Sequence, residues 1–263
     1  MSAIDDCFSQ LRQQQKKAFI PFITAGDPSL EVTQQLILAL QQAGCACVEL
    51  GIPYSDPIAD GPVIQDSYAR ALNSGIRLAD ILSSVAGLRG QLRIPLISMV
   101  SYSIVQRVGM EEFVSDSLKA GFSGSIVPDL LVEEAGSLRA ICRESDYSLI
   151  HLVTPTTPQE RMLRIAESSS GFIYFVSVTG ITGERAQLPA DLIKKGHWLR
   201  ERTDLPICIG FGISSAGQVR SLAPVADGLI VGSAIVRKLS EGPDPKASIA
   251  EVVRFVGELK RSL

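Results

Sequence analysis

A glutamate inside an apolar run is the first residue of this sequence whose chemistry needs an explanation. Glu49 stands between Val48 and Leu50, in a segment with the composition of a buried strand. A carboxylate there costs free energy unless it has a partner or a function. The loop that follows contains Asp56 and Asp60 among several prolines, and such a rigid loop can aim a carboxyl group at a ligand. A salt-bridged Glu49 facing a helix, with ordinary turn aspartates, is the alternative that the residues alone leave open.

Two glycine clusters later in the chain predict a site for an anion. Gly210-Phe211-Gly212-Ile213 and Gly232-Ser233-Ala234 each follow an apolar run. Glycines let backbone N–H groups approach an anion, and a helix that begins beside them adds favourable partial charge. Either cluster alone could be a tight turn. Together, after the last two strands of a barrel, they favour a phosphate site.

The elements that must position these residues alternate between strand and helix. Eight short β-branched or apolar runs are separated by segments of helical length, and they cover residues 18–24, 47–51, 96–100, 124–127, 148–153, 172–177, 206–210 and 228–231. Near-continuous hydrophobic strands between helices are typical of a parallel sheet covered on both faces. Eight such units in 263 residues predict an α/β fold, a (β/α)₈ TIM barrel in one domain spanning residues 1–263. A doubly wound open sheet is the competing architecture.

Three helices are predicted in more detail. In the helix after the first strand, Asp27 can cap the free amides, Pro28 suits the first helical position, and Gly44 ends the helix. Extra terminal helices at about 3–14 and 249–259 are expected to plug the ends of the barrel.

Composition excludes several classes of protein. A net charge of −3 argues against a nucleic-acid partner, and no apolar run is long enough to span a membrane. The polar, acidic N-terminus does not resemble a signal peptide, so a cytoplasmic location is expected. The five cysteines are scattered and are interpreted as core residues, and two histidines are too few for a histidine-built metal site.

The segment from Glu49 to Pro62, ELGIPYSDPIADGP, closely resembles the signature of the tryptophan synthase alpha subunit family. The resemblance continues in order over essentially the whole chain. Further matching segments are 19–28, 127–130, 174–177, 180–183, 210–213 and 231–234.

This resemblance implies an activity and roles for three catalytic residues. The family's reaction is a retro-aldol cleavage of indole-3-glycerol phosphate into indole and glyceraldehyde 3-phosphate, in tryptophan biosynthesis, with no cofactor in this subunit. By similarity, Glu49 is the general acid-base group, and Asp60 accepts the indole N–H hydrogen bond and stabilises the protonated ring. Tyr174 matches a tyrosine beside Glu49, although the residue alone fits equally well as a core aromatic.

The resemblance also implies substrate contacts. Apolar side chains would surround the indole, namely Phe22, Val100, Val127 and Val153. The loop 179–189 reads as a lid that excludes water, in which Thr182 and Gly183 contact the substrate and Thr182 meets the loop bearing Asp60 when the lid closes. The phosphate would lie against Phe211, Gly212, Ile213, Gly232 and Ser233.

The expected partner is the tryptophan synthase beta subunit, a pyridoxal-phosphate enzyme, in an α₂β₂ complex. Leu131 replaces a proline usual in the family, and residues 102–105 (Tyr-Ser-Ile-Val) depart from its Tyr-x-Asn-Pro pattern. Both departures lie near the predicted docking face, so the strength of coupling stays open. The alternatives are a stand-alone indole-3-glycerol-phosphate lyase, another phosphosugar-binding barrel such as an isomerase or epimerase, and a non-catalytic module that tunes a partner.

Overall fold

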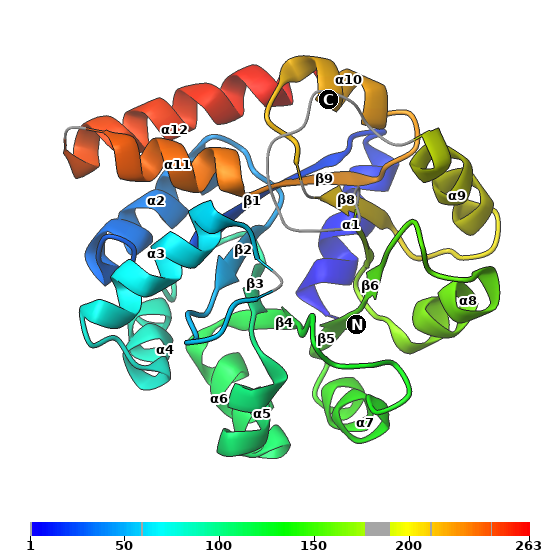
Figure 1. Cartoon of the computed structure of the whole chain (residues 1–263), viewed down its shortest axis with the longest axis horizontal. Coiled ribbons are helices and arrows are strands. Elements are labelled where there is room, and N and C mark those ends of the chain that lie inside the picture. The colour runs from blue at the N-terminus through cyan, green and yellow to red at the C-terminus, as the bar shows by residue number, and fades with distance from the viewer. Residues whose placement is uncertain (1, 59, 177–189, 211, 243) are drawn as a thin grey trace.

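The chain forms a ring of parallel strands surrounded by helices (Figure 1). The computed structural model describes residues 2–58, 60–176, 190–210, 212–242 and 244–263. Within these ranges the strands are β1 (Ala18–Thr24), β2 (Val48–Gly51), β3 (Leu96–Met99), β4 (Phe122–Ile126), β5 (Ser148–Ile150), β6 (Leu152–Val153), β7 (Ile173–Val176), β8 (Ile207–Gly210) and β9 (Gly228–Val231). They form one sheet in the order β5-β4-β3-β2-β1-β9-β8-β7-β6, so the TIM barrel predicted from the sequence is confirmed.

The fifth predicted strand is divided at one residue. His151 separates β5 from β6, and its carbonyl oxygen accepts a hydrogen bond from the backbone N–H of Tyr174 at 3.1 Å. β5 pairs with β4, whereas β6 pairs with β7. The run expected as one strand therefore changes partners at His151, and the chain itself closes the ring there.

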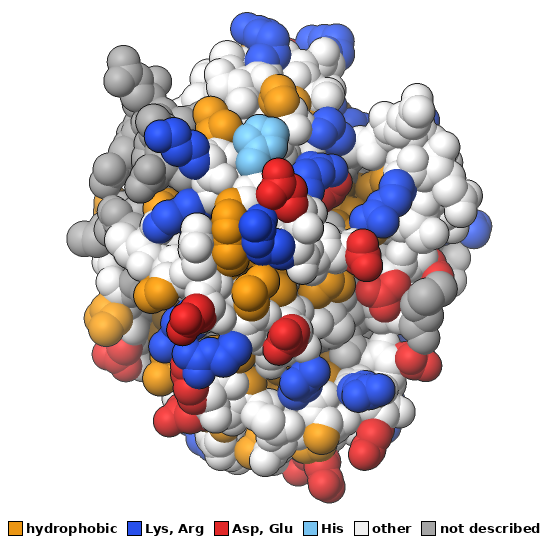
Figure 2. Space-filling model, turned by 90° about the vertical axis from the view of Figure 1, so that its right-hand side faces the viewer, with side chains coloured by type: hydrophobic (Ala, Val, Ile, Leu, Met, Phe, Trp, Pro, Cys, Tyr) orange, Lys and Arg blue, Asp and Glu red, His pale blue; other side chains and the backbone are white. Residues whose placement is uncertain are grey.

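The helices of the described residues connect these strands. They are α1 (Ala3–Gln13), α2 (Leu30–Gln42), α3 (Pro62–Asn73), α4 (Leu78–Ala86), α5 (Tyr102–Val108), α6 (Met110–Ala120), α7 (Gly136–Glu144), α8 (Gln159–Ser168), α9 (Ala190–Arg200), α10 (Ala216–Leu222), α11 (Ser233–Glu241) and α12 (Pro245–Lys260). None of the helices in the described ranges is both long and apolar enough to cross a membrane. On the face shown in Figure 2, basic and acidic side chains are interspersed, with no large region of one sign.

Strand side chains alternate between two hydrophobic clusters. Inside the ring lie Phe22, Cys47, Ile97 and Tyr174, whereas Val48 and its outward-facing counterparts on other strands pack against the helices. Successive side chains of a strand point to opposite faces, which explains this division. Glu49 is in register with Phe22 of β1 and Ile97 of β3, so its carboxyl group belongs to the interior of the ring.

Only one of the two predicted end-plugging helices occupies such a position. Ile4 and Phe8 of α1 are buried in the inner cluster, and the Phe8 ring lies 5.7 Å from that of Phe172, so α1 closes the amino-terminal end of the barrel. By contrast, α12 packs on α11, α2 and α10. The prediction that it plugs an end was wrong, because its apolar side joins the outer cluster through Val252 and Val256.

The start of α2 also differs from the prediction. Its N-cap is Ser29, whose hydroxyl accepts a hydrogen bond from the N–H of Val32, so the helix begins after Pro28. The Asp27 carboxylate instead receives two hydrogen bonds from the Arg70 guanidinium, both at 2.8 Å. Gly44, at a φ of +75°, follows the last helical residues as expected.

Candidate active site

A cavity at the carboxyl ends of the strands brings together most of the predicted site. Its lining consists of Phe22, Glu49, Asp60, Ile64, Met99, Tyr174, Gly212, Ile213, Ile230, Gly232, Ser233 and Ala234. These residues come from β1, β2, β3, β7 and β9, from the first turn of α3, and from the loops that follow β8 and β9, the two strands that continue the sheet beyond β1. The carboxyl ends of barrel strands are where catalytic residues collect in TIM-barrel enzymes.

Glu49 is the most unusual group in this cavity. Its side chain is 0% exposed, and neither carboxylate oxygen has a hydrogen-bond partner among the residues that the structure describes. Burial, and secondarily the negative charge of Asp60, raises the pKa of Glu49 to about 8. A carboxyl group with that pKa is mostly protonated at neutral pH and can donate a proton to a bound substrate.

Asp60 provides a second carboxyl group with a different environment. Burial raises its pKa to about 6, so it is mostly ionised at neutral pH while Glu49 is not. The side-chain amide of Gln65 donates hydrogen bonds to the carbonyl oxygens of Asp60 at 2.7 Å and of Pro57 at 3.2 Å. These two bonds fix the loop that carries the carboxylate to the first turn of α3.

Helix α3 is itself held against the barrel by polar contacts. The hydroxyl groups of Thr24 on β1 and Ser67 on α3 are hydrogen-bonded at 2.6 Å, and the Asp27–Arg70 ion pair joins the same two segments. Thr24 and Ser67 are buried, so their hydrogen bond is shielded from water, whereas the ion pair joins a buried Asp27 to an Arg70 side chain that is 44% exposed. Asp60 is thus aimed by a helix that is anchored to the neighbouring strand.

Two glycines give the aromatic rings of the cavity their space. A Cβ atom at Gly210 would collide with the ring and hydroxyl of Tyr174, and one at Gly51 would lie 2.6 Å from the ring of Phe22. Tyr174 is buried, and its burial together with the charge of Glu49 raises its pKa well above the ordinary value. Its phenol therefore stays protonated beside the two carboxyl groups.

The loops after β8 and β9, where the sequence predicts an anion site, also line the cavity. Gly212 has a φ of +74°, and its carbonyl oxygen accepts a hydrogen bond from the side chain of Gln218 at 3.0 Å. The same side chain accepts bonds from the backbone N–H groups of Ser214 and Ser215. Gly232 is the N-cap of α11, and the first amides of a helix have no partner within the helix. They are available to an anion in the cavity.

Three of the predicted indole contacts are not part of the lining. Val100, Val127 and Val153 are buried in the outer cluster, between the strands and the helices. The reason is strand alternation, because Met99 and Ile126 point inward and the residue after each points outward. The expectation that these valines face the cavity is therefore corrected, while Phe22 lies where it was predicted.

Three other predicted contacts lie outside the described residues. These are Thr182 and Gly183, with the whole of the predicted lid 179–189, and Phe211. Their roles stay predictions.

Four lining residues were missed by the sequence analysis, namely Ile64, Met99, Ile230 and Ala234. Strand pairing indicates two of them, Met99 and Ile230. Once Glu49 is assigned to the interior, parallel register assigns Ile97 and then Met99 to the same side, and Ile230 is paired with Ile20, two residues before the inward-facing Phe22. Ile64 comes from the first turn of α3 and Ala234 from that of α11, and no strand pattern indicates them.

The arrangement supports acid-base chemistry on a phosphorylated aromatic compound. One carboxyl group is protonated and another ionised at neutral pH, a phenol lies beside them, and apolar side chains surround them. The amino-terminal end of α11, Gly212 and Gly232 line the same cavity. Within the described residues, no group of three or more His, Cys, Asp or Glu side chains could hold a metal ion.

The two departures from the family pattern differ in exposure: Leu131 is exposed, whereas Ile104 and Val105 of the segment 102–105 are buried. The side chains of Ile58 and Leu131 are 86% and 53% exposed, which is unusual for large apolar residues in this chain. Nearby, the Asp129 carboxylate accepts hydrogen bonds from the backbone N–H of Tyr102 and the hydroxyl of Ser101. It thereby orders the start of α5, where the departure at residues 102–105 begins.

Comparisons with known proteins identify the family of the chain. The family model described as "Tryptophan synthase alpha chain" matches residues 8–263. A curated tryptophan synthase alpha chain of Rhodopirellula baltica is 52% identical over 262 residues, covering 98% of this chain and 94% of its own. The crystal structure of tryptophan synthase subunit alpha from Legionella pneumophila has a TM-score of 0.90 at 31% identity and covers 100% of this chain and 98% of its own.

A tryptophan synthase complex from Pyrococcus furiosus contains a chain with a TM-score of 0.85 and 33% identity. The structural match covers 92% of this chain and 97% of the Pyrococcus furiosus chain. The matches extend over both the second-strand signature and the glycine loops. This chain belongs to the tryptophan synthase alpha chain family.

Proposed function

We propose that this chain cleaves indole-3-glycerol phosphate into indole and glyceraldehyde 3-phosphate, with Glu49 and Asp60 as its catalytic residues. This is the alpha reaction of the tryptophan synthase family, a carbon–carbon lyase step in tryptophan biosynthesis. The observation that carries the residue assignment is a fully buried Glu49, without a hydrogen-bond partner among the described residues, in the cavity that Asp60 also lines. Burial raises the pKa of Glu49 to about 8 and that of Asp60 to about 6. We propose that these side chains suffice without a cofactor in this subunit.

In the first step Glu49 donates its proton to carbon 3 of the indole ring. Positive charge then spreads to the ring nitrogen, and the Asp60 carboxylate accepts a hydrogen bond from the indole N–H and stabilises this charge. A carboxylate stabilises a developing cation more strongly in a water-poor cavity than in bulk water, because the lower dielectric constant strengthens their electrostatic attraction.

In the second step the Glu49 carboxylate takes the proton from the hydroxyl group next to the breaking bond. The electrons of that O–H bond form the aldehyde, and the electrons of the carbon–carbon bond return to the ring as indole leaves. Glu49 is protonated again at the end, so one residue serves both steps. Acid-base assistance of this kind contributes about 10²–10⁴-fold in rate.

The other lining residues hold the substrate in position. The phosphate lies against the amides of Gly212, Gly232 and Ser233, and the indole lies against Phe22 and its apolar neighbours. Tyr174 orients the glycerol chain beside Glu49.

The partner is a tryptophan synthase beta subunit, a pyridoxal-phosphate enzyme, and the proposed assembly is α₂β₂. The exposed apolar side chains Ile58 and Leu131 lie on the carboxyl-terminal face, where they are available to a partner. This favours a complex over a stand-alone lyase. Glu49 and Asp60 together are not needed by a phosphosugar isomerase that uses the same anion cradle.

The test is to supply indole-3-glycerol phosphate to the purified chain, with and without a beta subunit, and to measure indole and glyceraldehyde 3-phosphate. Equal amounts of both products are expected, with a higher rate in the presence of the partner. Glu49→Gln should bind the substrate but release no indole. Near-normal indole release by that variant would overturn the assignment of Glu49, and the absence of indole under both conditions would overturn the function.

A further inference from the structure

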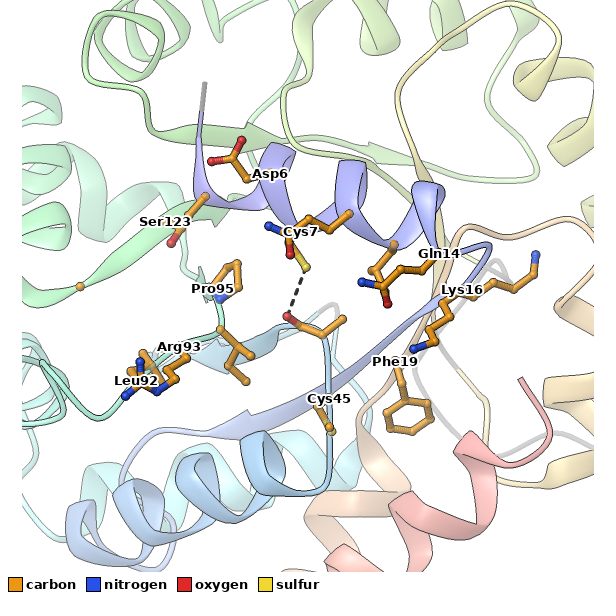
Figure 3. Close-up of a pocket in the computed structure, with 18 of the residues that line it drawn as sticks. Asp6, Cys7, Gln14, Lys16, Phe19, Cys45, Leu92, Arg93, Pro95 and Ser123 are labelled. Carbon is orange, nitrogen blue, oxygen red and sulfur yellow. Dashed lines mark hydrogen bonds between the residues drawn. The ribbon is translucent and has the colours of Figure 1, made fainter.

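A second cavity lies at the amino-terminal end of the barrel, around the plug helix α1 (Figure 3). Cys7 of α1 and Cys45 of the segment before β2 both line it. This end of the barrel is opposite the site described above, and the proposed reaction uses none of its residues.

Two thiols are in contact beside this cavity. The Sγ atom of Cys47, the residue that precedes β2, lies 4.0 Å from the Sγ atom of Cys7 and donates a hydrogen bond to it. Cys7 is half-buried and its Sγ also lies 3.4 Å from the carbonyl oxygen of Ala46, the contact drawn in Figure 3. Cys47 is 0% exposed. A small molecule in the cavity can therefore reach Cys7 but not Cys47.

The cavity is basic, which suits an anionic small molecule such as a glutathione disulfide, and Cys47 itself favours the thiolate of Cys7. Five basic side chains line it against one acidic side chain, and the basic ones are Lys16, Lys17, Arg89, Arg93 and Lys260. The hydrogen bond from Cys47 lowers the pKa of Cys7 although burial acts in the opposite direction. Burial raises the pKa of Cys45 to about 12, so the neighbouring thiol in the same cavity is much less reactive.

We propose that Cys7 and Cys47 are a thiol pair that a low-molecular-weight disulfide oxidises to a Cys7–Cys47 disulfide through the amino-terminal cavity. The Cys7 thiolate attacks one sulfur of the small disulfide, which gives a mixed disulfide on Cys7 and releases one small thiolate. Cys47 then attacks the Sγ of Cys7, and the second small thiolate leaves with the proton of Cys47. Two protein thiols are oxidised, and one disulfide is reduced to two thiols.

The new bond would join the plug helix to the barrel. The two Sγ atoms must approach from 4.0 Å to about 2.05 Å, a movement that rotation of side chains and a small shift of α1 can supply. β2 is hydrogen-bonded on both sides, to β1 and β3, and α1 is held by its own capping box at Ser2. The tether would close a long loop of chain and restrict the unfolded state.

The pair is tested by treating the native protein with oxidised glutathione and mapping the peptides that trypsin releases. Cleavage after Arg12, Lys17 and Arg70 gives Cys7 in the peptide 1–12 and both Cys45 and Cys47 in the peptide 18–70. A disulfide between these peptides is expected, with fragment ions that place it at Cys47. The thermal unfolding midpoint of the oxidised protein should rise by about 5 °C or more.

Two variants make the result specific. Cys7→Ser should form no linked peptides and should show no rise of the midpoint after the same treatment. Cys45→Ser, which changes the other thiol of the cavity, should retain both effects. A stable glutathione adduct on Cys7, a link to Cys45 instead, or no reaction of the native protein would each overturn the proposal.

Discussion

Replacing Glu49 by glutamine should make the protein more stable while it removes the proposed activity. The unfolded chain ionises Glu49 above its ordinary pKa of 4.5, whereas the folded protein keeps it protonated up to a pKa of about 8. The folded state therefore binds the extra proton between these two values, and its stability falls as the pH rises through this window. The glutamine side chain does not ionise in this pH range, so the variant avoids this loss of stability.

The size of the effect follows from the width of the window. Each unit of difference in pKa between the folded and unfolded states is worth about 1.36 kcal/mol. With the pKa raised from 4.5 to about 8, Glu49→Gln should gain about 1 kcal/mol at pH 5, about 3 kcal/mol at pH 7 and about 5 kcal/mol at pH 9 relative to the wild type. Because Glu49 is fully buried, solvent does not screen the effect.

The assay is urea unfolding of both proteins at these three pH values, with the free energy extrapolated to water. Glu258→Gln, at an exposed position on α12, serves as the control and should show little change at any pH. A Glu49→Gln protein that is no more stable at pH 9 than at pH 5, relative to the wild type, would show that Glu49 ionises normally. The proposed role as a proton donor at neutral pH would then fail.

The remaining predictions concern the pair of carboxyl groups and the space for the tyrosine. The rate of indole release should follow a bell-shaped pH profile with limbs near 6 and 8, because Asp60 must be ionised and Glu49 protonated; a rate that is flat across this range would contradict the assignment. Asp60→Asn should lower the turnover number by about 10²-fold or more. It should also shift the alkaline limb of the pH profile to lower pH, because the charge of Asp60 helps to raise the pKa of Glu49. Kinetic measurements over a range of pH test both effects, and an unchanged turnover number would remove Asp60 from the mechanism. Gly210→Ala should push the ring of Tyr174 out of place, which should lower the free energy of unfolding in urea by about 1–3 kcal/mol and lower the rate of indole release. The control Gly136→Ala, in open space on α7, should leave the free energy of unfolding unchanged or raise it slightly. Equal behaviour of the two variants would refute the crowding argument.

The strands of this protein could be predicted because each is a short apolar run between helical segments. The ranges 18–24 and 228–231 coincide with β1 and β9, and the run 148–153 is divided into β5 and β6 at His151. Within the described residues, the remaining runs differ from the observed strands by one or two residues at an end. Glu49 could be singled out by its type and position, since a carboxyl group in a buried strand is rare. Asp60 lies in a loop, and the family resemblance was needed to separate it from an ordinary turn residue. The glycine clusters after β8 and β9 were informative because a barrel places those two loops side by side.

Features that depend on packing between distant segments could not be read in the same way. The pairing of β3 with β2 places Met99 on the inner side, so the next residue, Val100, points outward. This direction becomes clear once the two strands are paired. Asp27 has the side chain of a helix cap, yet Arg70 on α3 takes its carboxylate and Ser29 caps α2 instead. The amphipathic pattern of α12 shows that one side is buried but does not show which neighbours cover it.

The protonation state of Glu49 in the folded protein is the claim on which the mechanism depends, and it can be measured without any substrate. Carbon-13 NMR of protein labelled at the glutamate side-chain carboxyl carbon follows each glutamate through a pH titration, and the signal missing in Glu49→Gln identifies the residue. We predict that this signal titrates with a midpoint near pH 8. A midpoint near 4.5, the ordinary value for glutamate, would contradict the account.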